Sequence, residues 1–194
     1  MQLIRIFSTA KAKGTEGYIR TQKKYEVIRT LLYFAVSFSL YVAGYIQTGQ
    51  RANLLTIVAV LGCLPASKSA VSAIMFLRAR GCSAETAKEI QTHSRELDGI
   101  YDCVFTSYKK NFSVSHMTVR GNTVCGYTED PKFQENEFYK HLGDILKLDG
   151  QKDVTVKIFS NLARYTERLE QMASLDREEA KTQSIIATLK SVSL

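Results

Sequence analysis

The chain has 194 residues and a formal net charge of +7, but this charge is distributed unevenly. Residues 1–29 carry +5, residues 30–80 carry +4, and residues 81–194 carry −2. A nucleic-acid-binding domain concentrates its positive charge on the folded surface. Because the part with the composition of a folded domain, residues 81–194, is slightly acidic, we expect no nucleic-acid partner.

Residues 1–29 form a basic segment, which we expect to be a cytosolic segment or helix. It holds seven lysines or arginines and two glutamates. The positive charge has two compatible interpretations. It sets the topology of the membrane segment that follows, or it docks on anionic lipid headgroups or on an acidic partner surface. Topology alone is sufficient to explain the charge.

Two apolar runs follow, and together they predict a transmembrane helical hairpin over residues 30–80. No charge of either sign occurs between Arg29 and Arg51, and no acid occurs between Glu26 and Glu85. A membrane-spanning helix needs about 17–25 residues. The predicted spans are about 30–46, which is marginal in length, and 54–77, which is ample. The alternative is a buried helical hairpin in a soluble protein, and the flanking positive charge favours the membrane. A cleaved signal peptide does not fit, because the first run begins about thirty residues into the chain.

The distribution of basic residues orients this hairpin. Seven precede the first span, Arg78 and Arg80 follow the second, and the connecting turn contains one. By the positive-inside rule we expect a cytoplasmic (inner) membrane protein with both termini in the cytosol. The predicted boundary residues are Arg29, Lys68, Arg78 and Arg80.

Lys68 interrupts the second apolar run and has two interpretations. If the hairpin folds near residue 50, Lys68 lies level with about Leu32, one turn inside the cytosolic boundary. Its ammonium group can then snorkel to the headgroups at small cost. If the second span is continuous from Leu54 to Leu77, Lys68 lies nearer the middle of the membrane and requires a water path. We favour the boundary position.

Small residues recur every fourth position on both spans, and they predict helix packing. A smooth stripe allows close approach of helix backbones in lipid. The packing partner is the other span of the same chain, a further copy, or a different membrane subunit. The predicted packing residues are Ala35, Ser39 and Ala43 on the first span and Gly62, Ala66 and Ala70 on the second.

Residues 81–194 predict a cytosolic α/β domain of order α-β-β-β-α-β-α with a long C-terminal helix. Ser83 is the predicted N-cap of its first helix, and Asp130-Pro131 the predicted start of its second. The strand 112–119 alternates as a half-buried strand does, and Arg120-Gly121-Asn122 predicts a tight hairpin turn. The fold class is therefore an α+β membrane protein. The four scattered cysteines predict no disulfide framework and a reducing compartment.

The α-β-β-β-α-β order is similar to the core of PD-(D/E)xK nucleases, which hold Mg²⁺ between acidic residues and phosphate. The matching residues are Asp102, Asp130 and Lys132, but Asp102 falls on the first strand rather than the second. A second candidate is a Cys/His pair formed by His116 with Cys103 or Cys125. Both are weak, so we expect no enzyme, catalytic residue, cofactor or metal.

We therefore expect a non-enzymatic, membrane-anchored accessory or scaffold subunit of a larger assembly. Its partners would be the lipid bilayer and other membrane subunits or further copies of itself. The alternative is an oligomeric pore or membrane effector gated by the cytosolic domain. In that alternative Ser67, Lys68, Ser69 and Ser72 line the conduit.

Overall fold

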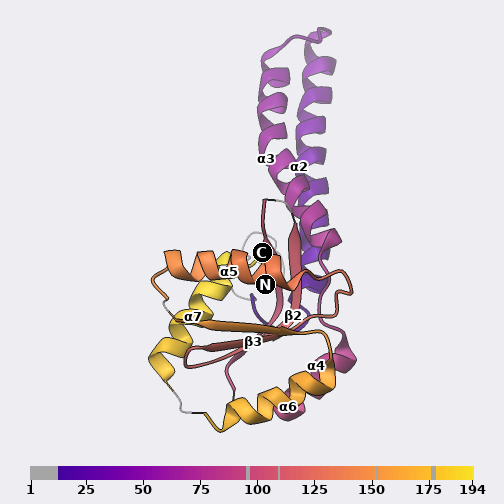
Figure 1. Cartoon of the computed structure of the whole chain (residues 1–194). Coiled ribbons are helices and arrows are strands. Elements are labelled where there is room, and N and C mark those ends of the chain that lie inside the picture. The colour runs from indigo at the N-terminus through magenta and orange to yellow at the C-terminus, as the bar shows by residue number, and fades with distance from the viewer. Residues whose placement is uncertain (1–12, 95–96, 109, 152, 176–177) are drawn as a thin grey trace. The chain divides into compact units, whose positions relative to one another are not determined.

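The computed structural model describes residues 13–94, 97–108, 110–151, 153–175 and 178–194. These residues divide into two compact units (Figure 1). One is the helical hairpin Arg20–Arg78. The other combines residues 13–19 with Ala79–Leu194. The second unit therefore contains the short segment that directly precedes the hairpin as well as the α/β domain.

The hairpin consists of two long antiparallel helices, α2 (Tyr18–Thr48) and α3 (Leu54–Arg78) (Figure 1). Both predicted spans are helical, and α2 begins inside the basic segment, twelve residues before its predicted span. The turn between them is short, with Gly49 at a φ of 66°. The Asn53 side chain accepts a hydrogen bond from the Thr56 backbone N–H at 2.8 Å and so caps the start of α3.

The α/β domain is built around a four-stranded mixed sheet of order β1-β2-β3-β4. β1, β2 and β3 form an antiparallel meander, and β4 pairs parallel to β3 through the crossover helix α5. The elements are α4 (Ala84–His93), β1 (Gly99–Thr106), β2 (Asn111–Arg120), β3 (Thr123–Tyr127), α5 (Glu135–Leu148), β4 (Thr155–Phe159), α6 (Leu162–Ala173) and α7 (Glu179–Val192). The predicted order is confirmed, with the C-terminal helix divided into α6 and α7.

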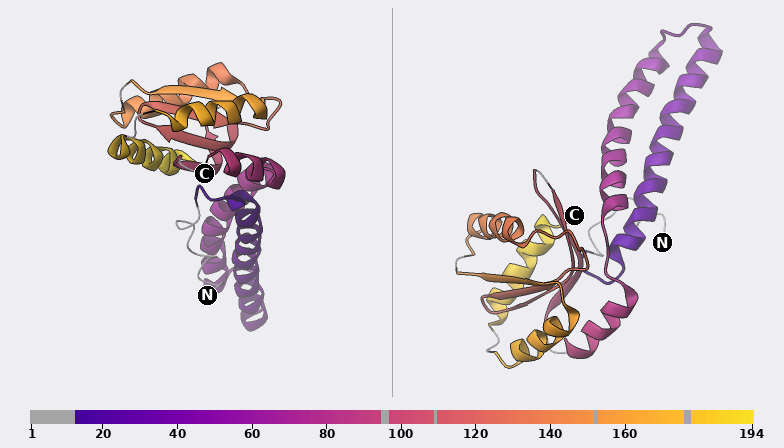
Figure 2. Two further views of the ribbon diagram at one scale, coloured as in Figure 1. Left: turned by 90° about the horizontal axis from the view of Figure 1, so that it is seen from below. Right: turned by 45° about the vertical axis from the view of Figure 1, so that its right-hand side comes forward.

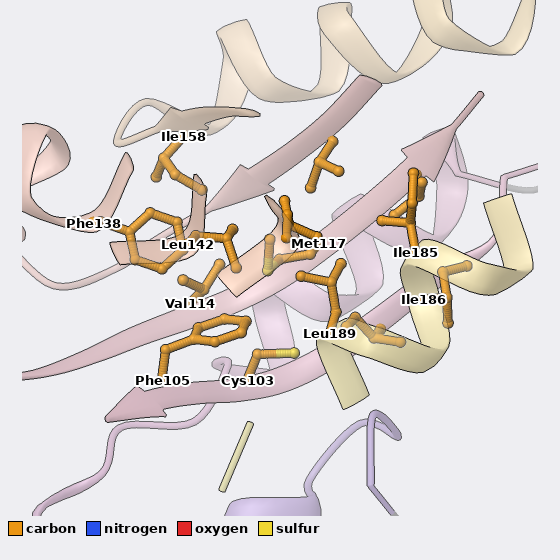
Figure 3. Packing of buried hydrophobic residues seen from close by; sticks show 14 of the residues in the cluster. Cys103, Phe105, Val114, Met117, Phe138, Leu142, Ile158, Ile185, Ile186 and Leu189 are labelled. Atoms are coloured by element: carbon orange, nitrogen blue, oxygen red, sulfur yellow. The ribbon is translucent and has the colours of Figure 1, made fainter. Parts of the chain in front are cut away.

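Helices cover both faces of the sheet, as the right-hand view of Figure 2 shows. One face packs against α5 and α7, and Figure 3 shows Phe138 and Leu142 from α5 and Leu189 from α7 in this core. The other face packs against α4 and α6, with Ile90 and Tyr165 among its buried residues. The domain is thus a three-layer α/β/α sandwich in which every long strand is buried on both sides.

The predicted alternation of the strand 112–119 is wrong beyond Val114. Phe112, Val114, Met117 and Val119 all lie in the α5/α7 core, so the inward face changes between residues 114 and 117. In β1, the strand paired with β2, the side chains also change face at this position. Ile100 and Cys103 share that core while Tyr101 lies on the other side. The physical reason is the backbone of Asp102, whose φ of 56° is left-handed and reverses the sense of alternation.

The predicted helix start at Asp130-Pro131 is also wrong, because α5 begins at Glu135 after a turn. The Asp130 carboxylate accepts the backbone N–H of Lys132 at 3.1 Å, and its carbonyl accepts that of Phe133 at 3.1 Å. This is a side-chain-stabilised turn, a local alternative to a helix that short acidic residues favour. By contrast, Ser83 caps α4 as predicted, accepting the Thr86 N–H at 3.2 Å.

Candidate functional site

The two helices of the hairpin meet through small and polar side chains. A Cβ placed on Gly62 would lie 2.7 Å from the Ser37 hydroxyl, so the helices are in close contact there. Nearer the base, the hydroxyls of Thr30 and Ser69 are hydrogen-bonded at 2.9 Å. Gly44 approaches Asn53 just as closely near the turn. The interface is therefore a narrow seam along which backbones approach each other.

The structure places the predicted packing residues on different faces. On α3, Ala66 is fully buried, while Gly62 and Ala70 are half-buried on the side toward α2. On α2, all three predicted residues are exposed, and Ser37 and Gly44 occupy the contact instead. Within one chain, the contact with α3 therefore lies on a different face of α2 from the predicted stripe, whose packing against a further helix stays a prediction. The exposed stripe is Ala35, Ser39 and Ala43.

A buried ion pair lies at the base of the seam. Glu26 is only 2% exposed, and its carboxylate accepts a hydrogen bond from Arg29 Nη2 at 2.5 Å. Gln22 Nε2 donates to the other oxygen at 3.3 Å, and Arg29 Nε lies 3.4 Å from the Ser69 hydroxyl. The sequence interpretation missed this cluster because Glu26 counted only as a flanking charge. Its signal was the polar series Gln22, Glu26, Arg29 and Thr30, which recurs at helical spacing on one face.

The contacts across the seam determine which residue of α2 lies opposite Lys68. Ser37 faces Gly62 and Thr30 faces Ser69. Both pairs fit one antiparallel register of α2 against α3. Lys68 therefore lies level with Leu31, two residues beyond Arg29. Its side chain is exposed, and no carboxylate pairs with it among the residues that the structure describes. The predicted pore-lining residues do not share a face: Ser69 is buried in the seam, whereas Ser67 and Lys68 are exposed.

The remaining two boundary residues lie at the end of α3 and just beyond it. Arg78 is the last residue of the helix and is exposed. Arg80 lies in the second unit, where its backbone N–H donates to the Ser113 hydroxyl at 3.4 Å. Its guanidinium lies 4.0 Å from the Asp130 carboxylate. Arg80 thus helps to hold the segment after α3 against the domain.

The hairpin carries most of the exposed apolar surface. Of the 18 most apolar consecutive residues in each helix, only 11% in α2 and 17% in α3 are buried within this chain. In the described chain, all but three of the exposed large hydrophobic side chains lie between Ile28 and Leu77, and the exceptions are Tyr108, Leu148 and Leu175. Two helices long and apolar enough to cross a membrane indicate membrane association.

In the second unit, Asp102 holds both segments that lead to the hairpin. Its carboxylate is 2% exposed and accepts the backbone N–H of Cys82 at 2.7 Å and that of Ile19 at 3.2 Å. Ile19 directly precedes the hairpin unit, and Cys82 lies four residues after the end of α3. The residue matched to a catalytic metal ligand is thus engaged with two backbone donors.

Glu129 forms a second carboxylate contact beside it. It accepts the backbone N–H of Ser83 at 3.1 Å and the hydroxyl of Thr86 at 2.6 Å, at the first turn of α4. Burial, together with the nearby carboxylates of Glu129 and Asp102, raises the pKa of the Cys82 thiol to about 12. The thiol stays protonated at neutral pH, and the two carboxylates hold the N-terminus of α4 in place.

The remaining catalytic candidates lie on different elements, with His116 and Cys125 on the α4/α6 side of the sheet. Lys132 is exposed in the turn, and no cluster of metal-ligating side chains occurs within the described ranges. Cys103 and His116 face opposite cores. His116 is buried against Tyr165, its Nδ1 2.7 Å from the tyrosine hydroxyl, and burial lowers its pKa to about 3. Burial also raises the pKa of Cys103 and Cys125, so neither thiol ionises readily.

Comparisons of this chain with protein-family models, with curated proteins and with solved structures find no match.

Proposed function

We propose that this chain is a non-enzymatic, membrane-anchored accessory or scaffold subunit of a larger membrane assembly. The hairpin spans the cytoplasmic membrane with both termini in the cytosol, and the α/β domain is displayed there as an interaction module. The observation that carries this proposal is that all but three of the exposed large hydrophobic side chains of the described residues lie on α2 and α3. A soluble monomer rarely exposes so large a contiguous apolar surface, whereas lipid accommodates it.

The chemistry of the domain supports an interaction role. Asp102 and Glu129 are engaged with backbone N–H groups and hydroxyls, and the buried thiols are protonated. Such a network stabilises the fold. The exposed stripe of Ala35, Ser39 and Ala43 on α2 supports contact with a further membrane helix, from another subunit or from a second copy.

Membrane insertion is tested by the reactivity of Cys63. This thiol is exposed on α3, whereas Cys82, Cys103 and Cys125 are buried. In sealed membrane vesicles a water-soluble maleimide should leave Cys63 unlabelled, because a polar reagent does not enter the hydrocarbon core. A variant with Gln50→Cys, in the turn, should be labelled from the external side only. Labelling of Cys63 in native vesicles at the rate of an exposed thiol would refute insertion.

The accessory role is tested by the mass of the complex after mild detergent solubilisation. We expect a mass well above that of the 21.8 kDa chain with its micelle, in a defined stoichiometry. A strictly monomeric chain without a co-purifying membrane subunit would contradict the role while leaving insertion intact.

The alternative function is an oligomeric pore gated by the cytosolic domain. The exposed position of Lys68 and Ser67 on α3 favours it, since both are accessible to a conduit between copies. It predicts ion flux in reconstituted liposomes whose selectivity changes in Lys68→Leu. Absent flux, or flux that the substitution leaves unchanged, would rule the alternative out.

A further inference from the structure

A groove of about 310 Å³ lies on the cytosolic end of α2. The described residues that line it come from three consecutive turns of the helix: Arg20, Thr21, Lys24, Tyr25 and Ile28. These residues recur at spacings of three and four, so they share one helical face. The groove therefore combines two cationic side chains, a phenol and an apolar wall along a single line.

The cations in this groove have no carboxylate partner among the described residues. Arg20 and Lys24 are exposed, and neither forms an ion pair there. The only acid within the first three turns of α2, Glu26, is buried in the seam and paired with Arg29. The positive charge of the groove is thus available to an anionic ligand, and the neighbouring Lys23 adds to it.

The depth of the groove relative to the apolar run suggests the kind of anion. Ile28 is 49% exposed and directly precedes Arg29, the last charge before the span. At a rise of about 1.5 Å per residue, Lys24 lies about 8 Å and Arg20 about 14 Å outside Arg29 along the helix. The headgroup layer extends about 5–8 Å beyond the hydrocarbon core on each side. Lys24 and Tyr25 therefore lie at phosphate depth, and Arg20 lies one turn of the helix further out.

We propose that this groove binds the phosphate-bearing headgroup of an anionic glycerophospholipid of the cytosolic leaflet. The Arg20 guanidinium matches two phosphate oxygens and the Lys24 ammonium supplies a second charge. Ile28 contacts the glycerol and the first acyl carbons. This site rests on the proposed membrane insertion, and it goes beyond topology determination because it requires selectivity for one class of lipid.

Native mass spectrometry of the full chain in detergent tests the site. The probes are dihexanoyl-phosphatidylglycerol, dihexanoyl-phosphatidylcholine and inorganic phosphate. We expect the unmodified chain to retain phosphatidylglycerol at least about tenfold more tightly than phosphatidylcholine, since each basic residue near an anionic surface contributes about 1 kcal/mol. The double variant Arg20→Gln/Lys24→Gln should lose this preference, and Arg20→Lys should keep part of it.

The matched control is Lys140→Gln/Lys147→Gln on α5. Both lysines are exposed, and the control removes the same net charge far from the groove in sequence. It should keep the full preference. Equal loss in both double variants, or no preference in the unmodified chain, would overturn the proposal. Displacement of phosphatidylglycerol by millimolar inorganic phosphate would assign the groove to a free anion and overturn the lipid assignment.

Failure of this site is distinguishable from failure of insertion. Extraction of vesicles of pure phosphatidylcholine with alkaline carbonate measures insertion without an anionic lipid. A chain that resists extraction but shows no lipid preference contradicts only the groove. A chain that is released by carbonate contradicts the membrane proposal on which the groove rests.

Discussion

Replacement of Asp102 should loosen both segments that connect the domain to the hairpin. The Asp102→Asn side chain has nearly the same shape, and asparagine tolerates the left-handed φ of 56° at this position. An amide, however, has one acceptor oxygen and one donor nitrogen. It can accept the N–H of Cys82 or that of Ile19, and it must turn an N–H donor toward the other.

The magnitude follows from these two contacts. A hydrogen bond to a charged group contributes about 1.5–3 kcal/mol, and a buried donor left without an acceptor costs about 1–3 kcal/mol. We therefore expect Asp102→Asn to lower the free energy of unfolding by about 2–4 kcal/mol. Asp102→Ala should cost more, because it removes both acceptors and adds about 1–2 kcal/mol of backbone strain.

The assay is denaturant unfolding of the full chain in detergent, with hydrogen exchange read by mass spectrometry. Peptides that contain Ile19 and Cys82 should lose protection by about 30-fold for each 2 kcal/mol. Asp153 is the matched control, since it also has a positive φ, of 60°, but is exposed. Asp153→Asn should change stability by less than about 0.5 kcal/mol. Equal effects of the two asparagine substitutions, with protection retained at Ile19 and Cys82, would refute the role of the carboxylate.

Three further predictions concern the seam and the buried core. Gly62→Ala should lower the melting temperature in detergent by the equivalent of about 1–3 kcal/mol. Adding Ser37→Ala should restore it, because the two Cβ atoms would then lie 3.6 Å apart. Failure of this rescue would contradict the contact. Glu26→Gln should lower the free energy of unfolding by about 3–5 kcal/mol, whereas Glu85→Gln, at an exposed position on α4, should be nearly neutral. Equal effects would argue against a buried pair. The pKa of His116 is about 3 in the folded chain and about 6.5 in the unfolded chain. As the pH falls, the unfolded chain therefore binds the proton first. The free energy of unfolding should fall by about 2 kcal/mol from pH 7.5 to pH 5. His116→Gln should flatten this slope, and an unchanged slope would assign it to other groups.

The elements were predictable where local composition determines them. The charge-free runs between Arg29 and Arg51 and after Asn53 are long and apolar, so both helices followed from composition alone. The strands were predictable for the same reason, and so was the turn at Gly121, whose φ of 55° a glycine adopts freely. The start of α5 was mispredicted because an aspartate before a proline suits both a helix start and a turn.

The contacts that define the candidate site depend on pairing between distant residues. The α2 helix carries two small-residue series, one through Ala35 and Ala43 and one through Ser37 and Gly44. Periodicity gives them equal weight, and only the position of Gly62 selects the second. Likewise, the left-handed backbone of Asp102 is maintained by two N–H groups, 83 and 20 residues away in sequence. No local pattern contains that information.

Because Lys68 lies opposite Leu31, the two helices of the proposed membrane anchor have charge-free segments of different length. On α2 the charge-free helix extends from Thr30 to Thr48, about 28 Å, whereas on α3 it extends only from Leu54 to Ser67, about 21 Å. A hydrocarbon core of about 30 Å matches the first length and exceeds the second. In a bilayer this difference favours local thinning around α3 or a tilt of the pair. In the proposed assembly, a neighbouring helix that covers α3 would relieve this mismatch.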